Sequence, residues 1–201
     1  SVLMISILSH VVEFRNSESG QHVLHIRTLT DLLLHQLVQK TDRYQLDESD
    51  ISLISTASAL HDIGKIMIPE EILNKPGRLT EEEYAAIKTH TTEGARILKG
   101  LAIGQDEPLV KVAHAICRWH HERWDGGGYP DRLKGDEIPI AAQVVALADV
   151  YDALTSERCY KQSYSHEKAV DMILHGECGS FNPLLMECLK ESSELLRTEL
   201  Q

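Results

Sequence analysis

Basic residues are scarce in this sequence. Its 201 residues contain 20 Lys and Arg against 31 Asp and Glu, which gives a formal net charge of −11 at pH 7 with neutral histidines. Non-specific binding to nucleic acid depends on a basic surface that neutralises phosphates, so the composition argues against a DNA-binding protein. The apolar fraction of 42% and the charged fraction of 25% are ordinary for a globular chain and exclude disordered and collagen-like classes.

Paired cysteines and long apolar runs are also missing. The four cysteines lie far apart without a Cys-x-x-Cys pair, which argues against a zinc ribbon or a disulfide framework and favours reduced thiols in a cytoplasmic protein. The apolar residues 2–14 are too few to span a bilayer and include His10 and Glu13. The chain begins within a predicted helix and without Met, so we expect the helix 1–15 to connect to a missing upstream regulatory domain.

Helical periodicity extends through nearly the whole sequence, and no stretch of four or more residues alternates like a half-buried strand. The predicted helices cover residues 2–15, 18–40, 51–60, 81–98, 108–121, 140–154, 166–175 and 183–196. Asp47 with Asp50, and Thr80 with Glu83, are typical of residues that start a helix. The pattern therefore predicts an all-α fold, with one domain at 16–201 built as a helical bundle of about seven or more helices.

The dipeptide His61-Asp62 follows the predicted helix 51–60 directly. A neutral imidazole and a carboxylate suit Fe, Mn, Zn or Ni, although such a pair is more often an ordinary surface feature. Lys65 follows three residues after Asp62 and adds a charge that either contacts a phosphate or lies in solvent at a helix end. The pair is a candidate metal site.

A second candidate is His120-His121, which closes the predicted helix 108–121 and precedes a glycine-rich polar loop. Consecutive helical residues point about 100° apart, so adjacent imidazoles serve two neighbouring ions better than one. The pair indicates a centre with more than one metal ion, and the alternative is a chance pair at a helix end.

Four segments in order resemble an HD-GYP domain, a branch of the HD phosphohydrolases. They are residues 61–65 (HDIGK), 74–80 (NKPGRLT), 120–130 (HHERWDGGGYP) and 149–156 (DVYDALTS), and Arg158 continues the last segment. The resemblance covers about residues 18 to 189 and implies a helical bundle of HD-domain type. It also implies an enzyme that degrades bacterial cyclic dinucleotides, chiefly cyclic di-GMP.

The same resemblance implies a set of metal ligands. They are His61, Asp62, His90, His120, His121 and Asp149. Glu18 and His22 fit a further pair found in members that resemble trinuclear iron enzymes, although Glu18 equally suits a helix start, where an acid favours the dipole. His25 shares the helical face of His22 and is interpreted as a packing residue or a residue behind the ligands. The implied cofactors are two or three transition-metal ions, most of all Fe, with Mn as an alternative.

Other matched positions concern the substrate and the partners. Asp62 and Lys65 are the implied catalytic residues, and Lys65, Arg158 and Lys161 would contact the phosphates. The Tyr129-Pro130 loop is linked in the family to site shape and to docking of a partner, such as a diguanylate cyclase-type or other signalling domain. Two departures from the family pattern are Cys159, in place of the usual Pro, and Asn182, in place of Asp.

The predicted function is a metal-dependent cyclic di-GMP phosphodiesterase, in which a water activated by metal ions yields pGpG, GMP or both. One alternative keeps the fold and changes the substrate to 3′,3′-cyclic GMP-AMP or another nucleotide. A second alternative is an inactive, metal-bound sensor or docking module. We also expect a cytoplasmic location, a possible homodimer, no membrane span and no DNA partner.

Overall fold

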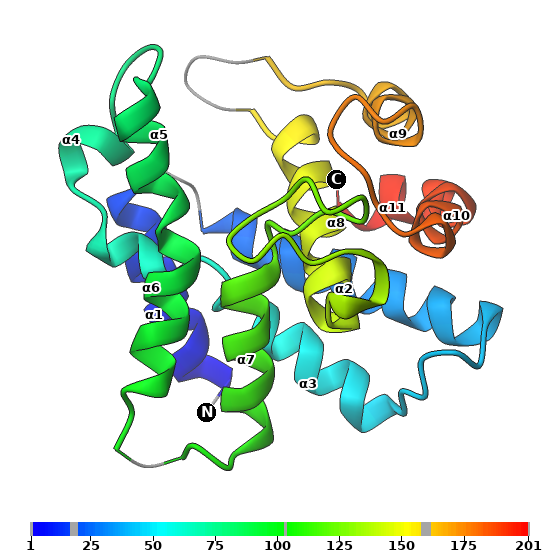
Figure 1. Cartoon of the computed structure of the whole chain (residues 1–201). Coiled ribbons are helices and arrows are strands. Elements are labelled where there is room, and N and C mark those ends of the chain that lie inside the picture. Colours follow the sequence, from blue (N-terminus) through cyan, green and yellow to red (C-terminus); the bar gives the residue numbers. More distant parts are fainter. Residues whose placement is uncertain (1, 17–19, 103, 158–161, 201) are drawn as a thin grey trace.

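The computed structural model describes residues 2–16, 20–102, 104–157 and 162–200. These residues form α-helices and two short 3₁₀ helices, with no β-strand in the described ranges (Figure 1). The elements are α1 (Val2–Arg15), α2 (Gln21–Lys40), α3 (Glu48–Ser58), η1 (Ile63–Met67), α4 (Glu70–Leu73), α5 (Glu81–Lys88), α6 (His90–Lys99), α7 (Pro108–Trp119), η2 (Gly135–Glu137), α8 (Ile140–Thr155), α9 (His166–Leu174), α10 (Pro183–Glu191) and α11 (Ser193–Glu199). The predicted all-α bundle is confirmed.

Helix α2 forms the centre of the hydrophobic core. Its side chains at positions 26, 29, 33, 34 and 37 are fully buried, and this spacing is that of one face of a helix. The buried face packs against α3, α8 and α10. In Figure 1, α4, α5 and α6 lie on one side of α2 and α8, and α9 to α11 lie on the other.

Side-chain caps fix two of the helix starts, as the sequence predicts. The carboxylate of Asp47 accepts from the backbone N–H of Asp50 at 2.8 Å, and Asp50 accepts from the N–H of Asp47 at 3.0 Å. Thr80 and Glu83 make the same reciprocal pair at the start of α5. Each pair satisfies backbone donors that have no partner within the first turn of a helix.

The predicted helix 81–98 is wrong in one respect, because it is two helices that meet at Thr89. The hydroxyl of Thr89 donates to the carbonyl of Ala86 at 2.5 Å, and Nδ1 of His90 bonds the carbonyl of Ile87 at 2.6 Å. Side-chain donors of this kind compete with the regular helical ladder. The predicted helix 183–196 also divides, at Ser192.

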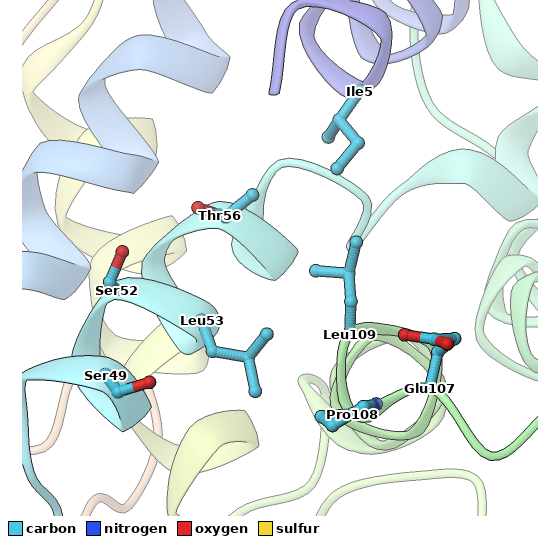
Figure 2. A pocket seen from close by; sticks show the side chains of 8 residues that line it. All are labelled: Ile5, Ser49, Ser52, Leu53, Thr56, Glu107, Pro108 and Leu109. Atoms are coloured by element: carbon cyan, nitrogen blue, oxygen red, sulfur yellow. The ribbon is translucent and has the colours of Figure 1, made fainter. Parts of the chain in front are cut away.

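Helix α1 packs on the bundle with one face only. Ile5, Ser9 and Glu13 are buried, whereas Leu3 and Phe14 are 71% and 79% exposed. Ile5 also borders a groove of about 450 Å³ that side chains of α3 and the start of α7 line from the other sides (Figure 2). No helix in the described ranges combines the length and the apolar character needed to cross a bilayer.

Candidate metal centre

The imidazoles and carboxylates that the resemblance implies as ligands converge at one end of the bundle. They come from five parts of the chain: His22 from the first turn of α2, His61 and Asp62 from the segment before η1, His90 from the start of α6, His120 and His121 from the end of α7, and Asp149 from α8. Glu18 lies outside the described residues. Within the described part of the chain, every predicted ligand is therefore at this site.

The donor atoms form two groups of three. His90, His120 and His121 make the first group, and His22, His61 and Asp149 make the second; in each group the ligand atoms lie within 4.8 Å of one another. His120 and His121 thus share a group, which differs from the divergence expected of consecutive helical residues. The reason is that α7 ends at Trp119, and the two rings lie 4.3 Å apart between centroids.

Asp62 lies between the two groups. Its Oδ1 is 3.3 Å from Nε2 of His90 and 3.4 Å from Nε2 of His120, and its Oδ2 is 3.1 Å from Nε2 of His61. One carboxylate therefore presents one oxygen to each group. A carboxylate in this position would hold an ion at each group.

Hydrogen bonds on the outer nitrogens orient three of the imidazoles. Each Nδ1–H donates to a backbone carbonyl three or four residues earlier: His61 to Ser58 at 2.8 Å, His90 to Ile87 at 2.6 Å and His120 to Ile116 at 2.9 Å. A neutral imidazole that donates from Nδ1 keeps the lone pair of Nε2 for the centre of the site. The local helical turns thus set the orientation of each ring and direct its Nε2 toward the centre of the site.

Asp152 orients His22 in the same way, and sequence reasoning did not assign it a role. Its Oδ2 accepts from Nδ1 of His22 at 2.5 Å, and its Oδ1 accepts from Nδ1 of His25 at 2.8 Å. Burial favours the neutral acid, but the hydrogen bonds from His22 and His25 lower the pKa of Asp152 to about 2. The available signal was spacing, because Asp152 follows Asp149 by three residues on one face of α8. Through Asp152, His25 lies behind the ligands, which is one of the two interpretations that the sequence leaves open.

The residues present fit transition-metal ions. Among the described residues, Nε2 of His61 and Oδ1 of Asp62 are buried without a hydrogen-bond partner. Lone pairs of His90 and Asp62 only 3.3 Å apart repel each other unless a cation lies between them. Burial of His121, with His120 and His90 nearby, holds its pKa well below the usual value, so this imidazole is neutral and able to bind metal. Imidazoles grouped with carboxylates in this way suit Fe, Mn, Zn and Ni.

Comparison with known families agrees with this geometry. The family model described as HD domain matches residues 4–181. The chain belongs to the HD domain family.

Curated relatives of this HD domain include enzymes named for two substrates. This chain is 40% identical to a probable cyclic di-GMP phosphodiesterase of Vibrio cholerae, over 92% of this chain and 42% of that protein. It is also 40% identical to 3′3′-cGAMP-specific phosphodiesterase 2 of the same organism, over 92% of this chain and 33% of that protein. A cyclic di-GMP phosphodiesterase of Thermotoga maritima is 36% identical, over 98% of this chain and 51% of that protein. The chain thus spans about half or less of the length of these relatives.

Solved structures show the same fold. A cyclic GMP-AMP-specific phosphodiesterase of V. cholerae matches all of this HD domain and 50% of its own chain, with a TM-score of 0.69 and 21% identity. An HDGYP protein of Bdellovibrio bacteriovorus matches 86% of this HD domain and 51% of its own chain, with a TM-score of 0.65 and 22% identity. The predicted HD-GYP resemblance is confirmed.

A cavity of about 770 Å³ opens over the two donor groups of the HD domain. Four cationic side chains line it: Lys65, Lys88, Arg123 and Arg132. Of these the sequence predicted only Lys65, whose Nζ lies 3.0 Å from Oδ2 of Asp62. Arg158 and Lys161, the other predicted phosphate contacts, lie outside the described residues. The cationic lining favours an anionic ligand despite the acidic net charge of the chain.

The glycine-rich loop 122–137 forms one wall of this cavity and is held by Glu122. The buried carboxylate of Glu122 accepts from the backbone N–H groups of Asp131 at 2.7 Å and Leu133 at 2.9 Å. Within the loop, the ring of Tyr129 stacks on His121 with centroids 4.9 Å apart and planes within 10°. The loop therefore contacts a candidate ligand directly, which agrees with the part in site shape that the resemblance implies for Tyr129-Pro130.

Proposed function

We propose that this HD domain is a metal-dependent phosphodiesterase that hydrolyses cyclic di-GMP to pGpG, GMP or both. The observation that carries the proposal is the position of Asp62, between two groups of three ligand atoms on the floor of a cation-lined cavity. The curated relatives named as cyclic di-GMP phosphodiesterases support it. The proposal includes a cytoplasmic location.

The proposed centre contains two ions, one at each donor group, with Fe as the first choice and Mn as the second. Bound there, the ions would supply positive charge for a phosphate and lower the pKa of a water molecule. A third ion is proposed only through Glu18, which lies outside the described residues. The Nε2 lone pairs, oriented by the hydrogen bonds from Nδ1 to backbone carbonyls, make the nitrogen donors ready for either metal.

In the proposed reaction, a water oxygen attacks phosphorus in line, and the bond from phosphorus to the ribose 3′-oxygen breaks. The attacking water gives up a proton and the leaving 3′-oxygen takes one up, so each cleavage consumes one water, and a second hydrolysis converts pGpG to two GMP. Lys65 is held on the cavity floor by Asp62, so its ammonium group faces the negative charge that develops on the phosphate oxygens. Asp152 keeps His22 in a fixed orientation throughout.

A second candidate substrate is 3′,3′-cyclic GMP-AMP. A relative named for that substrate is as similar to this chain as one named for cyclic di-GMP, at 40% identity for both. The other alternative, a metal-bound sensor without turnover, would use the same described donors, and the hydrolysis test below separates it from the enzyme. A regulatory domain attached to this HD domain is part of the proposal. A partner that binds the Tyr129-Pro130 loop would reach the site through the stacked ring of His121.

The test uses protein reconstituted anaerobically with Fe(II) or Mn(II). Cyclic di-GMP is added, and products are separated by liquid chromatography while bound metal is counted by elemental analysis. We expect at least two ions per chain and formation of pGpG. Fewer than one tightly bound ion, or two bound ions without cleavage of any cyclic dinucleotide, contradicts the proposal.

A further inference from the structure

We infer that Tyr84 and Lys88 on α5 form a guanine-binding subsite in the wall of the cavity. The inference rests on the proposed function, and it goes further by naming the residues that distinguish guanine from adenine. Sequence motifs did not single out either residue. Both line the same cavity as Asp62 and Lys65.

Lys88 lies between two aromatic rings. Its Nζ is 4.8 Å from the ring centroid of Tyr84, one turn earlier on α5, and 5.4 Å from that of Tyr129 in the glycine-rich loop. Within the described part of the chain, no carboxylate is within ion-pair distance of Lys88. This ammonium group therefore keeps its N–H donors for a ligand, whereas Lys65 directs its own to Asp62.

Tyr84 supplies a flat apolar surface beside that charge. Its side chain is 50% exposed although it borders a cavity, so a face of the ring is open to a bound molecule. Nucleobases stack on aromatic side chains in this way, and stacking itself tolerates any base. An aromatic surface next to a cation thus fits a purine better than it fits a bare phosphate.

The identity of the purine follows from the chemistry of lysine. An ammonium group has only donors, and guanine offers two acceptors, O6 and N7, along one edge. Adenine has N7 with the donor group N6–H₂ at the corresponding positions, so a lysine pairs with guanine and meets a like donor on adenine. Lys88 is therefore expected to set the base preference at this subsite.

The subsite also lies close enough to the donor groups for one nucleotide to reach both. Tyr129 stacks on His121, a candidate metal ligand, and Lys88 lies over the ring of Tyr129. Lys88 is thus one side-chain layer away from the donor groups. A nucleotide whose phosphate lies at Lys65 and the donor groups extends its base toward Tyr84 and Lys88.

The experiment measures binding separately from turnover. Metal-loaded protein is titrated calorimetrically with hydrolysis-resistant phosphorothioate analogues of cyclic di-GMP and cyclic di-AMP. For the wild type we expect tighter binding of the guanine analogue. For Lys88→Met we expect roughly tenfold weaker binding of the guanine analogue and a change of less than about twofold for the adenine analogue, because one base-specific pair is lost.

Two further variants complete the test. Tyr84→Leu is expected to weaken the binding of both analogues by a similar factor, because stacking is independent of the base. Lys99→Met removes an exposed cation that does not line the cavity and is the matched control, with both affinities unchanged. Equal affinity of the wild type for the two analogues, or an equal loss for both in Lys88→Met, overturns the inference; the second result would make Lys88 a phosphate contact.

The failure of the inference and that of the proposed function give different results. Hydrolysis of bis(4-nitrophenyl) phosphate, which has no purine, and of cyclic di-GMP by the wild type reports on the proposed function alone. A wild type that cleaves cyclic di-GMP, with a Lys88→Met variant that keeps the wild-type base preference, overturns only the guanine subsite. A wild type that discriminates between the analogues through Lys88 but cleaves no substrate overturns only the proposed hydrolysis.

Discussion

Gly64 and the backbone carbonyl of His90 approach each other so closely that a Cβ atom at position 64 would lie 1.9 Å from the carbonyl oxygen of His90. Gly64 belongs to η1, directly after the His61-Asp62 pair, and His90 begins α6. The contact sets the distance between two parts of the chain that supply donors to different groups. Glycine is therefore required here for close packing, since no larger residue fits the space.

We predict that Gly64→Ala lowers the free energy of unfolding by roughly 1–3 kcal/mol, because the backbone on one side must move to admit the methyl group. Chemical denaturation of the metal-free protein measures the loss, and the bound metal count should fall with it. Gly100→Ala is the control, since a Cβ there comes no closer than 3.3 Å to another atom. Equal stability of Gly64→Ala and the wild type would contradict the packing argument.

Asp62→Ala is predicted to abolish hydrolysis and to reduce the bound metal to fewer than two ions per chain. The reason is that Asp62 faces both donor groups, so its loss weakens each of them. Far-ultraviolet circular dichroism should remain that of a helical protein. The exposed Asp106 provides the control substitution, Asp106→Ala, which should keep full turnover. Turnover near the wild-type level in Asp62→Ala would exclude the assigned role.

Asp152→Ala is predicted to weaken metal binding at the group of His22, His61 and Asp149 by roughly 10–100-fold, because His22 loses the acceptor that orients its ring. The group of His90, His120 and His121 should retain its ion. A metal titration followed by elemental analysis distinguishes the two groups by stoichiometry. Loss of both ions together, or of neither, would show that Asp152 does not act through His22.

The same residue predicts a pH dependence of stability. The pKa of Asp152 is about 2 in the folded protein, against 3.8 for an unperturbed aspartate, so ionisation of Asp152 favours the folded state. The stabilisation, about 2 kcal/mol, is complete above the unfolded pKa and is lost as pH falls from about 4 toward 2. Denaturation of metal-free wild type and Asp152→Asn should therefore show a stability difference that shrinks over this range. A difference that stays constant with pH would rule out this linkage.

Glu18→Ala separates the two interpretations of Glu18 that the sequence leaves open. A third ion held by Glu18 predicts a metal count lower by about one, with the other ions still bound. A role at the helix start predicts an unchanged count and a stability loss of roughly 0.5–1 kcal/mol. Elemental analysis of anaerobically reconstituted protein decides between the two.

Much of the fold was predictable because local signals were strong. The apolar spacing in α2 and the reciprocal pair of Thr80 and Glu83 both act within one or two turns, so they can be read from the sequence alone. The division at Thr89 was not predictable in the same way. A Thr and a His are tolerated within a helix, and here their side-chain donors take up backbone carbonyls of the preceding turn.

The candidate ligands were predicted by resemblance, whereas the residues around them depend on tertiary contacts. Asp152 meets His22 only because α2 and α8 pack together, across a sequence separation of 130 residues. Lys88 enters the cavity because α5 lies beside the glycine-rich loop that carries Tyr129. The spacing of Asp152 from Asp149 indicated only a shared face of α8. It did not indicate that His22 lies opposite that face or that Tyr129 lies beside Lys88, since both contacts join segments that are distant in sequence.

The position of Asp62 between the donor groups has a consequence for how the centre fills. Each oxygen of one carboxylate faces a different group, so an ion bound at the first group would withdraw negative charge from the oxygen that faces the second. The same first ion would also fix the orientation of the carboxylate for the next. We therefore expect the two binding steps to be coupled, so that filling one group changes the affinity of the other. Asp152→Ala, which weakens binding at the group of His22, His61 and Asp149, should then also shift the affinity of the ion that remains at the other group, and an unchanged affinity there would exclude the coupling.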